Sequence, residues 1–260
     1  MFPKPIALVT GATRGIGKAV ALKLAEKGFS LAICARGKQQ LEETALEIKK
    51  RGEEVLALKL DANVNCQVLS AVEKAFERFK RIDVLINNAG GEGIIKEILD
   101  ISDEDWLQDL NQNFLGVTRF CKATIPYMLK NKFGRIVNVS SIAAVQPDPL
   151  YIPYCTAKAC IIAYSKALSK KFASDNILVN TVLPGLVDTR QMAYVEKTLS
   201  NMLNHTPGEI RKSFEESTGI GRYASPEEIA HLIVFLTSRE SNYITGGTYV
   251  IDGGALKNIP

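Results

Sequence analysis

Histidine and cysteine are scarce in this sequence, and the few that occur do not form a metal-binding pattern. His205 and His231 are the two histidines among the 260 residues, and neither has a partner at the spacing of metal ligands. The cysteines are odd in number, widely scattered and without a C-x-x-C pair, which argues against a disulfide framework or a zinc site. We therefore expect no metal, and we interpret the cysteines as small core residues: Cys34, Cys66, Cys121, Cys155 and Cys160.

A strong net charge and long apolar runs are also missing. The formal charge of +4 is small for this length, so nothing indicates a nucleic acid partner. No apolar run reaches membrane-spanning length, and we expect no membrane association. Residues 1–5 lack the pattern of charge, apolar run and cleavage site that marks a secretory signal, and we expect a cytoplasmic protein.

What the chain does contain is an alternation of short apolar runs with amphipathic stretches. The expected strands are 6–10, 29–34, 54–60, 82–86, 135–139, 177–183 and 248–251. The expected main helices are 18–27, 39–51, 65–79, 102–130, 153–173 and 227–237. This alternation predicts an α/β fold with a Rossmann-like, doubly wound, seven-stranded parallel sheet and helices on both faces. No linker or composition shift divides the chain, so we predict a single domain over residues 1–260.

One segment departs from this rhythm. Residues 188–222 form a connection far longer than those usual in α/β units. Thr206-Pro207-Gly208 divides this segment into two probable short helices. Long excursions of this kind usually serve as lids or binding loops, and we predict a substrate-binding lid. An oligomer contact or a disordered flap is the alternative.

A glycine-rich turn follows the first expected strand and precedes the first expected helix. Gly11, Gly15 and Gly17 have the spacing G-x-x-x-G-x-G. Glycine is needed where the backbone approaches a phosphate closely or adopts a positive φ. The helix that opens near Ile16 directs free N–H groups and a positive dipole end toward an anion. In this position between strand and helix, the turn predicts a dinucleotide site.

The end of the second strand indicates which dinucleotide binds. An acidic residue there would hold the adenosine ribose of NAD, but the residues are Cys34-Ala35-Arg36. Arg36 and Arg14 can converge on the 2′-phosphate of NADP, because guanidinium groups bind phosphate in a bidentate manner. The alternative is that both arginines are merely solvated. Asp61, after the third strand, is placed either to accept the adenine amino group or to cap a helix.

Residues 141–158 carry a hydroxyl, a phenol and an ammonium. Tyr154 and Lys158 are four residues apart, so a helix would place both on one face. A neighbouring ammonium lowers the pKa of a phenol toward the range where it exchanges a proton with a substrate oxygen. Ser141 lies upstream, where its hydroxyl can hold that oxygen. Taken alone, a Y-x-x-x-K spacing is a common accident on helices. Tyr151 lacks the pattern, because Cys155 stands four residues after it.

Several motifs follow one another in a fixed order. They are T-G-A-T-R-G-I-G at 10–17, N-N-A-G at 87–90, Asn113, Ser141, Y-C-T-A-K at 154–158 and P-G-L-V-D-T at 184–189. Through these motifs, the sequence resembles the short-chain dehydrogenase/reductase family. The resemblance extends from about Ile6 to Gly254. The resemblance implies hydride transfer between a nicotinamide cofactor and a carbonyl/alcohol pair.

The resemblance also implies catalytic roles. Tyr154 would protonate the carbonyl oxygen in reduction, and Lys158 would bind the nicotinamide ribose and lower the Tyr154 pKa. Ser141, rather than Ser140, would bind the substrate oxygen, and Asn113 would hold a water that links Lys158 to solvent. The residues expected to bind NADP(H) are Gly11, Thr13, Arg14, Gly15, Ile16, Gly17, Arg36, Asp61, Ala62, Asn88, Ala89, Gly90, Tyr154, Lys158, Pro184, Gly185, Val187 and Thr189.

The expected substrate is an apolar ketone, because the predicted pocket lining is mostly apolar. That lining comprises Ala143, Val145, Leu150, Leu186, Met192, Tyr194, Leu199, Met202 and Leu203. In function the sequence looks closest to 3-oxoacyl-thioester reductases, and a rim of lysines would then face an acidic carrier protein or a coenzyme A phosphate. These lysines are Lys130, Lys132, Lys170 and Lys171. The long 188–222 segment instead favours a bulkier ketone.

Three functions compete on these residues. The first is an NADPH-dependent ketone reductase. The second is a non-catalytic NADP-sensing regulator on the same fold, which has no need of the Tyr154–Lys158 pair. The third is a structural subunit that relies on a partner's active site. The resemblance further implies a homotetramer, or a homodimer, built on the helices 103–130 and 153–173.

Overall fold

A seven-stranded parallel sheet occupies the centre of the molecule. The computed structural model describes residues 4–257, and within them the strand order is β3-β2-β1-β4-β5-β6-β7. The strands are β1 (Ile6–Thr10), β2 (Ser30–Ala35), β3 (Val55–Lys59), β4 (Val84–Asn87), β5 (Gly134–Val139), β6 (Ile177–Pro184) and β7 (Thr248–Ile251). The predicted sheet is confirmed, with most strand ends displaced by one or two residues.

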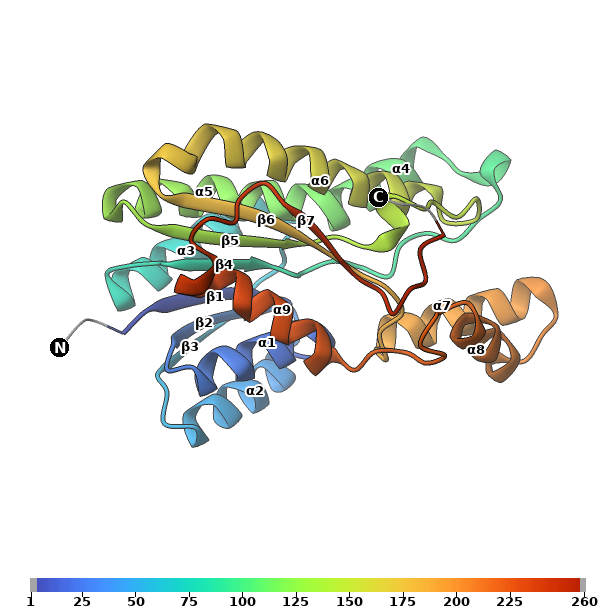
Figure 1. Ribbon diagram of the computed structural model, residues 1–260, viewed down its shortest axis with the longest axis horizontal. Coiled ribbons are helices and arrows are strands. Elements are labelled where there is room, and N and C mark those ends of the chain that lie inside the picture. The colour runs from blue at the N-terminus through green and yellow to red at the C-terminus, as the bar shows by residue number, and fades with distance from the viewer. Residues whose placement is uncertain (1–3, 258–260) are drawn as a thin grey trace.

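Helices cover both faces of the sheet, as Figure 1 shows. One layer contains α1, α2 and α9, and the other contains α3, α5 and α6. The helices are α1 (Gly15–Glu26), α2 (Lys38–Lys50), α3 (Asn65–Phe79), α4 (Asp103–Leu110), α5 (Gly116–Asn131), α6 (Ile152–Phe172), α7 (Arg190–Leu203), α8 (Pro207–Glu216) and α9 (Pro226–Thr237). The sheet is therefore the middle of three layers.

The two faces of the central strand explain why the sheet is buried on both sides. Successive side chains of a strand point to opposite faces. Ala7 and Val9 of β1 pack in one core with α1 and α9, while Leu8 packs in the other with α3 and α5. All five residues of β1 are buried. A strand buried on both faces is a continuous apolar run, which is what the sequence shows.

The strand order reverses beside β1. β1 pairs with β2 on one side and with β4 on the other, so the chain returns from β3 at the edge to the middle of the sheet. In open parallel sheets, the connections that leave the carboxyl ends of the strands separate at such a point and leave a crevice. The fold therefore places a ligand site at the ends of β1 and β4.

One predicted helix is wrong in detail. The stretch 102–130 is not one regular helix, because a π-helical turn, Asn111–Leu115, separates α4 from α5. Ser102 caps α4, since its side chain accepts a hydrogen bond from the Asp105 N–H. A π turn holds one extra residue, which rotates the side chains that follow. Periodicity in the sequence does not reveal such an insertion.

The predicted excursion forms α7 and α8, and the break at Thr206-Pro207-Gly208 is confirmed. Thr206 caps α8 and forms a capping box with Glu209, and Pro207 is the first helical residue. Figure 1 shows both helices, in orange, beyond one end of the sheet. This position keeps them outside both helical layers.

Three of the five cysteines are buried as predicted, and burial raises the pKa of Cys34 and Cys121 to about 12. Cys160 is partly buried, whereas Cys66 is exposed on the first turn of α3, so the core assignment is wrong for that residue. Within residues 4–257, no helix combines the length and the apolar character needed to span a membrane. Residues 1–3, on which the expected cytoplasmic location partly depended, lie outside the described part.

Candidate active site

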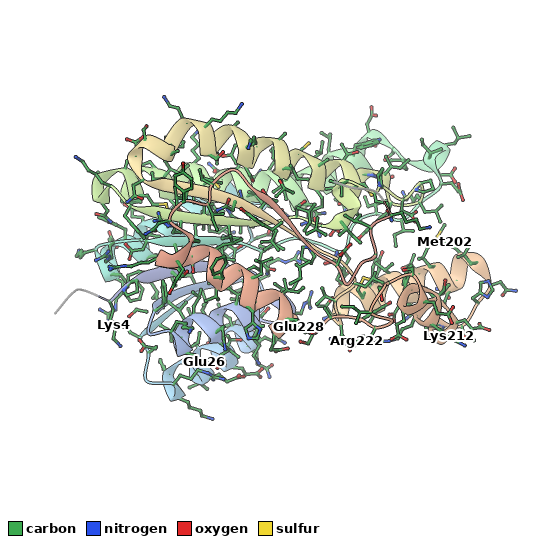
Figure 2. The ribbon with its side chains drawn as sticks, viewed as in Figure 1. Lys4, Glu26, Met202, Lys212, Arg222 and Glu228 are labelled. Carbon is green, nitrogen blue, oxygen red and sulfur yellow. The ribbon has the colours of Figure 1, made fainter. Side chains whose placement is uncertain are left out.

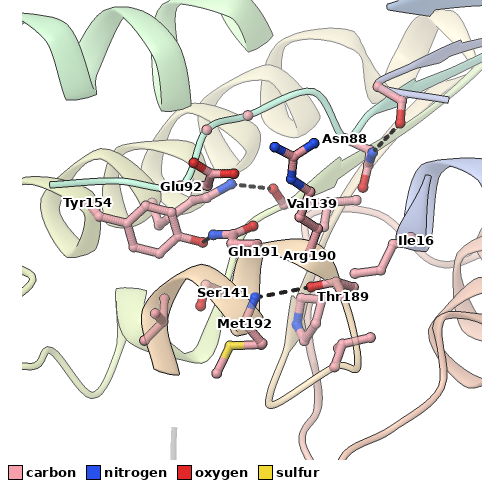
Figure 3. A pocket seen from close by; sticks show the side chains of 18 of the residues that line it. Ile16, Asn88, Glu92, Val139, Ser141, Tyr154, Thr189, Arg190, Gln191 and Met192 are labelled. Atoms are coloured by element: carbon pink, nitrogen blue, oxygen red, sulfur yellow. Dashed lines mark hydrogen bonds between the residues drawn. The ribbon is translucent and has the colours of Figure 1, made fainter. Parts of the chain in front are cut away.

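A cavity of about 990 Å³ opens where the strand order reverses. The carboxyl ends of six strands reach it, through Thr10, Ala35, Leu60, Asn88, Val139 and Pro184. The start of the 188–222 segment, which we call the lid after its predicted role, lines its far side. A volume of this size falls at the upper end of the range typical of ligand and cofactor sites. Figure 3 shows the part of the cavity between the glycine turn and the lid.

The glycine turn forms one wall. Gly11 and Gly15 have φ values of +67° and +51°, which favour glycine. A side chain at Gly17 would collide with the Gly11 carbonyl and with the Asn88 amide. Arg14 caps α1 without a side-chain hydrogen bond, so the first N–H groups of the helix are not capped by a side chain. This backbone cradle suits a diphosphate, as predicted.

Asn88 and Thr10 hold the turn against β4. The Asn88 side-chain amide donates to the carbonyl groups of Thr10 and Gly11, at 3.2 and 3.3 Å. The Thr10 hydroxyl accepts from the backbone N–H of Asn88 and of Ala89. Gly90 follows, and a β-carbon there would lie 2.9 Å from Asn113 Oδ1. The small residues of this segment therefore keep the backbone close to the cavity.

Two arginines stand at the end of the cavity beyond β2. Arg14 and Arg36 both line it, and both are exposed. Among residues 4–257, neither forms an ion pair with a carboxylate. Their charges are thus available to an anionic ligand, and no acidic side chain follows β2.

Asp61 and Ala62 line the same end of the cavity. The helix that follows is capped by Val64 and not by Asp61, so the capping alternative for Asp61 is wrong. Its carboxylate accepts from the Asn63 N–H at 2.9 Å, in a local turn. Thr13 and Ile16, also predicted to bind the cofactor, line the cavity on the side of α1.

The exit of β6 forms the wall opposite the glycine turn. Pro184, Gly185, Val187 and Thr189 all line the cavity. Val187 forms a parallel β-bridge with Ala224. The hydrogen bonds of this bridge run from the Ala224 N–H to the Leu186 carbonyl and from the Asp188 N–H to the Ala224 carbonyl. Thr189 caps α7, and its methyl group lies 3.1 Å from the β-carbon position of Gly15. The glycine turn and the lid therefore meet at Thr189.

Tyr154 and Lys158 stand one turn apart on α6, as predicted. Both are buried, each with 6% of its surface exposed. The Lys158 ammonium lies 5.5 Å from the centre of the Tyr154 ring and donates to the Val139 carbonyl at 3.2 Å. Figure 3 shows this hydrogen bond beside Tyr154. A buried phenol and ammonium together are unusual in a protein core, because each is costly to desolvate.

Burial controls the ionisation of both groups. Desolvation raises the pKa of Tyr154 to about 12, and hydrogen bonds from Gln191 and Ser141 oppose this rise. Desolvation lowers the pKa of Lys158 to about 8, and the charge of Asp109 opposes this fall. The net shift of the Tyr154 pKa is upward, so burial outweighs any lowering of the kind expected from Lys158.

The two serines have different partners. Ser140 donates its hydroxyl to the backbone carbonyl of Lys158 at 2.8 Å. Ser141 Oγ accepts from the Ala143 N–H at 3.1 Å, and its hydroxyl also hydrogen-bonds to Tyr154. Both residues line the cavity. Ser141 is therefore the serine whose hydroxyl lies beside the Tyr154 oxygen.

Asn113 lies behind the cavity wall, in the π-helical turn. Its Oδ1 accepts from the Gly91 N–H at 2.9 Å, and its Nδ2 donates to Asp109. Asp109 is buried and also accepts from the Ile94 N–H at 2.9 Å. Sequence analysis missed Asp109, although its position four residues before Asn113 is the spacing of neighbours on a helix. The pair ties the loop 91–94 to the helix.

Two further side chains, Tyr151 and Gln191, shape the end of the cavity around Tyr154 and were not predicted. The Tyr151 ring stacks on Tyr154 with centres 4.3 Å apart, and its hydroxyl donates to the Glu92 carbonyl. Gln191 Nε2 donates to the Tyr154 hydroxyl at 3.3 Å. No sequence signal marks Gln191, since the contact depends on how the lid folds back. Tyr151 could have been found as an aromatic residue one turn before Tyr154.

The lining of the substrate end agrees only partly with the prediction. Ala143, Leu150, Leu186, Met192 and Leu199 line the cavity as expected. Val145, Tyr194, Met202 and Leu203 do not line it and are 38–50% exposed. Each of these four side chains points away from the cavity. The position of a residue around its helix or loop, and not its hydrophobicity, decides which way the side chain points. Polar residues also line this end: Glu92, Gln112, Gln146, Tyr151 and Gln191.

The predicted lysine rim does not form. Lys130 and Lys132 lie at the end of α5, and Lys170 and Lys171 lie in the last turn of α6. None of the four lines the cavity. The helix rises about 1.5 Å per residue, so Lys170 is about 24 Å along α6 from Tyr154. Helices that start at the site carry their last turn to the opposite edge of the sheet.

Comparisons with known proteins agree with this architecture. A family model described as enoyl-(acyl carrier protein) reductase matches residues 11–255. The 3-oxoacyl-[acyl-carrier-protein] reductase FabG of Thermotoga maritima is 35% identical over 251 residues, 96% of each chain. The 7alpha-hydroxysteroid dehydrogenase of Clostridium sardiniense is 35% identical over 257 residues, 98% of this chain and 94% of that protein. The crystal structure of a variant actinorhodin polyketide ketoreductase with NADPH has a TM-score of 0.93, at 32% identity and 97% coverage of each chain.

The fold and the site together define a dinucleotide-dependent oxidoreductase built on a doubly wound sheet. The chain belongs to the short-chain dehydrogenase/reductase family, whose members are NAD(P)-dependent enzymes acting on CH–OH and C=O groups.

Proposed function

We propose that this protein is an NADPH-dependent reductase that converts a ketone to a secondary alcohol, with Tyr154 as the proton donor. The observation that carries the proposal is the buried Tyr154–Lys158 pair in a cavity that also contains a glycine cradle and two arginines. Neither arginine has an ion-pair partner within residues 4–257. A 3-oxoacyl thioester, or another apolar ketone, is the proposed substrate. The acyl-carrier-protein reductases among the relatives and the apolar side chains of the lid support this choice.

The residues present fit NADP(H). The backbone around Gly11, Gly15 and Gly17 leaves room and free N–H groups for a diphosphate, and Arg14 and Arg36 supply charge for a 2′-phosphate. Lys158 would hold the nicotinamide ribose. When bound, the cofactor supplies the hydride, and the protein supplies orientation, a proton and a dry site.

The chain's own residues account for the proton. Ser141 donates a hydrogen bond that orients the substrate carbonyl beside Tyr154. The Tyr154 O–H then gives its proton to the carbonyl oxygen as negative charge develops there. Lys158, protonated at neutral pH with a pKa of about 8, stabilises the phenolate left behind. Asn113, held by Asp109, would keep a water between Lys158 and solvent.

The test is turnover of NADPH by the purified protein with a panel of substrates. The panel holds a short and a long 3-oxoacyl thioester, a fused-ring ketone, a sugar ketone and an enoyl thioester. We expect turnover with one of the ketones, and we expect Tyr154→Phe to lower kcat by a factor of about 10² to 10⁴ while NADPH binding is retained. Dinucleotide binding without turnover of any substrate would favour the NADP-sensing regulator instead. Turnover of the enoyl thioester alone would place the reaction at a C=C bond.

Turnover by the purified protein would also exclude a structural subunit that relies on a partner. We propose a homotetramer, or a homodimer, built on α4, α5 and α6, as in the expectation from sequence. Leu107 and Leu115 support it, because they are 67% and 38% exposed on α4 and on the π-helical turn before α5. Light scattering of the purified protein tests the association, and a monomer at working concentration contradicts it.

A further inference from the structure

The lid places one side chain directly on the oxygen of Tyr154. Gln191 is the second residue of α7, and its Nε2 donates to the Tyr154 hydroxyl at 3.3 Å. Figure 3 shows the Gln191 amide next to the ring of Tyr154. Tyr154 is only 6% exposed and lines the cavity, and the Gln191 amide is a hydrogen-bond donor to its hydroxyl.

The position of Gln191 is fixed by the way the lid begins. Thr189 accepts from the Met192 N–H and so starts α7 beside the glycine turn, and Val195 is buried one turn later. The Gln191 amide also hydrogen-bonds to Tyr151, whose ring stacks on Tyr154. The amide therefore lies at the edge of two stacked phenols, and it reaches them from an element outside the sheet and its two layers.

We propose that Gln191 is a catalytic residue of this enzyme, which stabilises the Tyr154 phenolate by hydrogen bonding while the proton is transferred. The inference rests on the proposed reductase function. In the reduction, the carbonyl carbon would accept a hydride with its two electrons from bound NADPH, which would become NADP⁺. The π electrons of the C=O bond would move to the oxygen, which takes the proton of Tyr154. The Tyr154 O–H bond breaks, and a phenolate remains until solvent returns a proton.

The physical reason is that the same N–H group interacts more strongly with a charged oxygen than with a neutral one. A hydrogen bond to an ionised partner is roughly twice as strong as one between neutral groups. The Gln191 amide therefore stabilises the phenolate more than the phenol, and it is the largest effect that opposes the rise of the Tyr154 pKa on burial. An interaction that strengthens as charge develops accelerates the reaction.

The contact also couples the lid to the chemistry. When α7 is displaced, Tyr154 loses this donor, and its proton becomes harder to release. Turnover therefore depends on a closed lid even for a substrate that does not touch α7. The substrate panel can show this, because a small ketone would then be as sensitive to Gln191 as a large one.

The experiment compares Gln191→Met, which keeps the length of the side chain but cannot donate, with Gln191→Glu, which places a carboxylate near the phenolate. Both are expected to lower kcat about tenfold to a hundredfold, with little change in the KM for NADPH. In the oxidative direction, the rise of activity with pH is expected to move to higher pH, because the phenolate is the active form. Lys197→Met, on the exposed face of the same helix, is the control and is expected to behave as wild type.

A second readout does not depend on turnover. Nuclear magnetic resonance of isotope-labelled tyrosine, assigned with Tyr154→Phe, reports the fraction of Tyr154 that is ionised at a given alkaline pH. A smaller ionised fraction in Gln191→Met than in wild type is expected. Unchanged kcat and unchanged ionisation, or faster turnover in Gln191→Met, would overturn the proposal. If wild type turns over no ketone, the proposed function fails, while the ionisation of Tyr154 still decides whether Gln191 stabilises the phenolate.

Discussion

Lys158 places an ammonium in a position that is almost fully buried, where its one hydrogen-bond partner within residues 4–257 is the Val139 carbonyl. Burial lowers its pKa from 10.5 to about 8, and the charge of Asp109 opposes this fall only in part. A lysine whose pKa is lower in the folded protein than in the unfolded chain destabilises the fold at every pH at which the unfolded chain is protonated. Buried Lys158 therefore lowers the stability of the fold, although the same ammonium is the proposed partner of Tyr154 in the reaction.

We expect Lys158→Met to increase the free energy of unfolding at pH 7, by an amount on the order of 3 kcal/mol at most. Between about pH 8 and 10.5, the folded wild type binds fewer protons than the unfolded chain, so wild-type stability rises with pH. The advantage of the variant should shrink by about 1.4 kcal/mol per pH unit in that window.

Urea unfolding without cofactor at several pH values measures this difference. Lys170→Met, exposed on the same helix, provides the control and should show no such pH dependence. A constant difference between Lys158→Met and wild type from pH 7 to 10 would show that Lys158 is not desolvated in solution.

At the scale of elements, a charged cluster joins the lid to the body of the protein. Arg211 of α8 lies 3.4 Å from Asp188, 3.1 Å from Glu215 and 4.0 Å from the buried Glu196 of α7. Its guanidinium also stacks over the ring of Tyr223, with 4.4 Å to the ring centre. One side chain thus links both lid helices to the segments before and after them.

Arg211→Met is expected to loosen α7 and α8 and to leave the sheet unchanged. Loss of a partly exposed cluster costs on the order of 1 kcal/mol, which makes local opening about fivefold more frequent. Hydrogen exchange should therefore quicken in the two lid helices while α1 and α9 keep their protection.

The matched control is the neighbouring Lys212→Met. Lys212 pairs with Glu216 alone, at 3.9 Å and on an exposed surface, and Figure 2 shows it on the outside of the lid. Equal exchange in the two variants would mean that Arg211 has no special role. Faster exchange throughout the chain would mean that the lid and the sheet open as one unit.

At the scale of the whole molecule, the cavity spans the point where the two halves of the sheet meet. Residues after β1, β2 and β3 line one part, and residues after β4, β5 and β6 line the other. A dinucleotide bound there contacts both halves, so its binding energy adds to the stability of the entire fold.

We expect NADPH to raise Tm by more than NADH at equal concentration, because Arg14 and Arg36 favour the 2′-phosphate. At a hundredfold excess over Kd, the gain is about 2.7 kcal/mol, which corresponds to roughly 5–10 °C for a chain of this size. Arg36→Asp should reverse the order of the two cofactors. Calorimetric melting of wild type and variant measures this, and equal shifts with NADH and NADPH in wild type would contradict the proposed choice of NADP.

The sequence alone determined the sheet, its parallel direction, the glycine turn and the Tyr154–Lys158 pair. These features depend on rules of short range: apolar runs of strand length, a turn that only glycine allows, and a four-residue spacing on a helix. Even the lid was visible as a segment too long for an ordinary connection, with its break at Thr206-Pro207-Gly208.

Tertiary structure decided which side chains from distant elements meet. Asn113, in the π-helical turn, meets Gly91 of the loop after β4, and Gln191 reaches Tyr154 because the start of α7 lines the cavity. In the same way, the predicted lysine rim lies at the far edge of the sheet, since each helix carries its last turn away from the site. The rotation of a helix about its axis and the edge at which it ends are fixed by packing between elements, and no local pattern of residues encodes them.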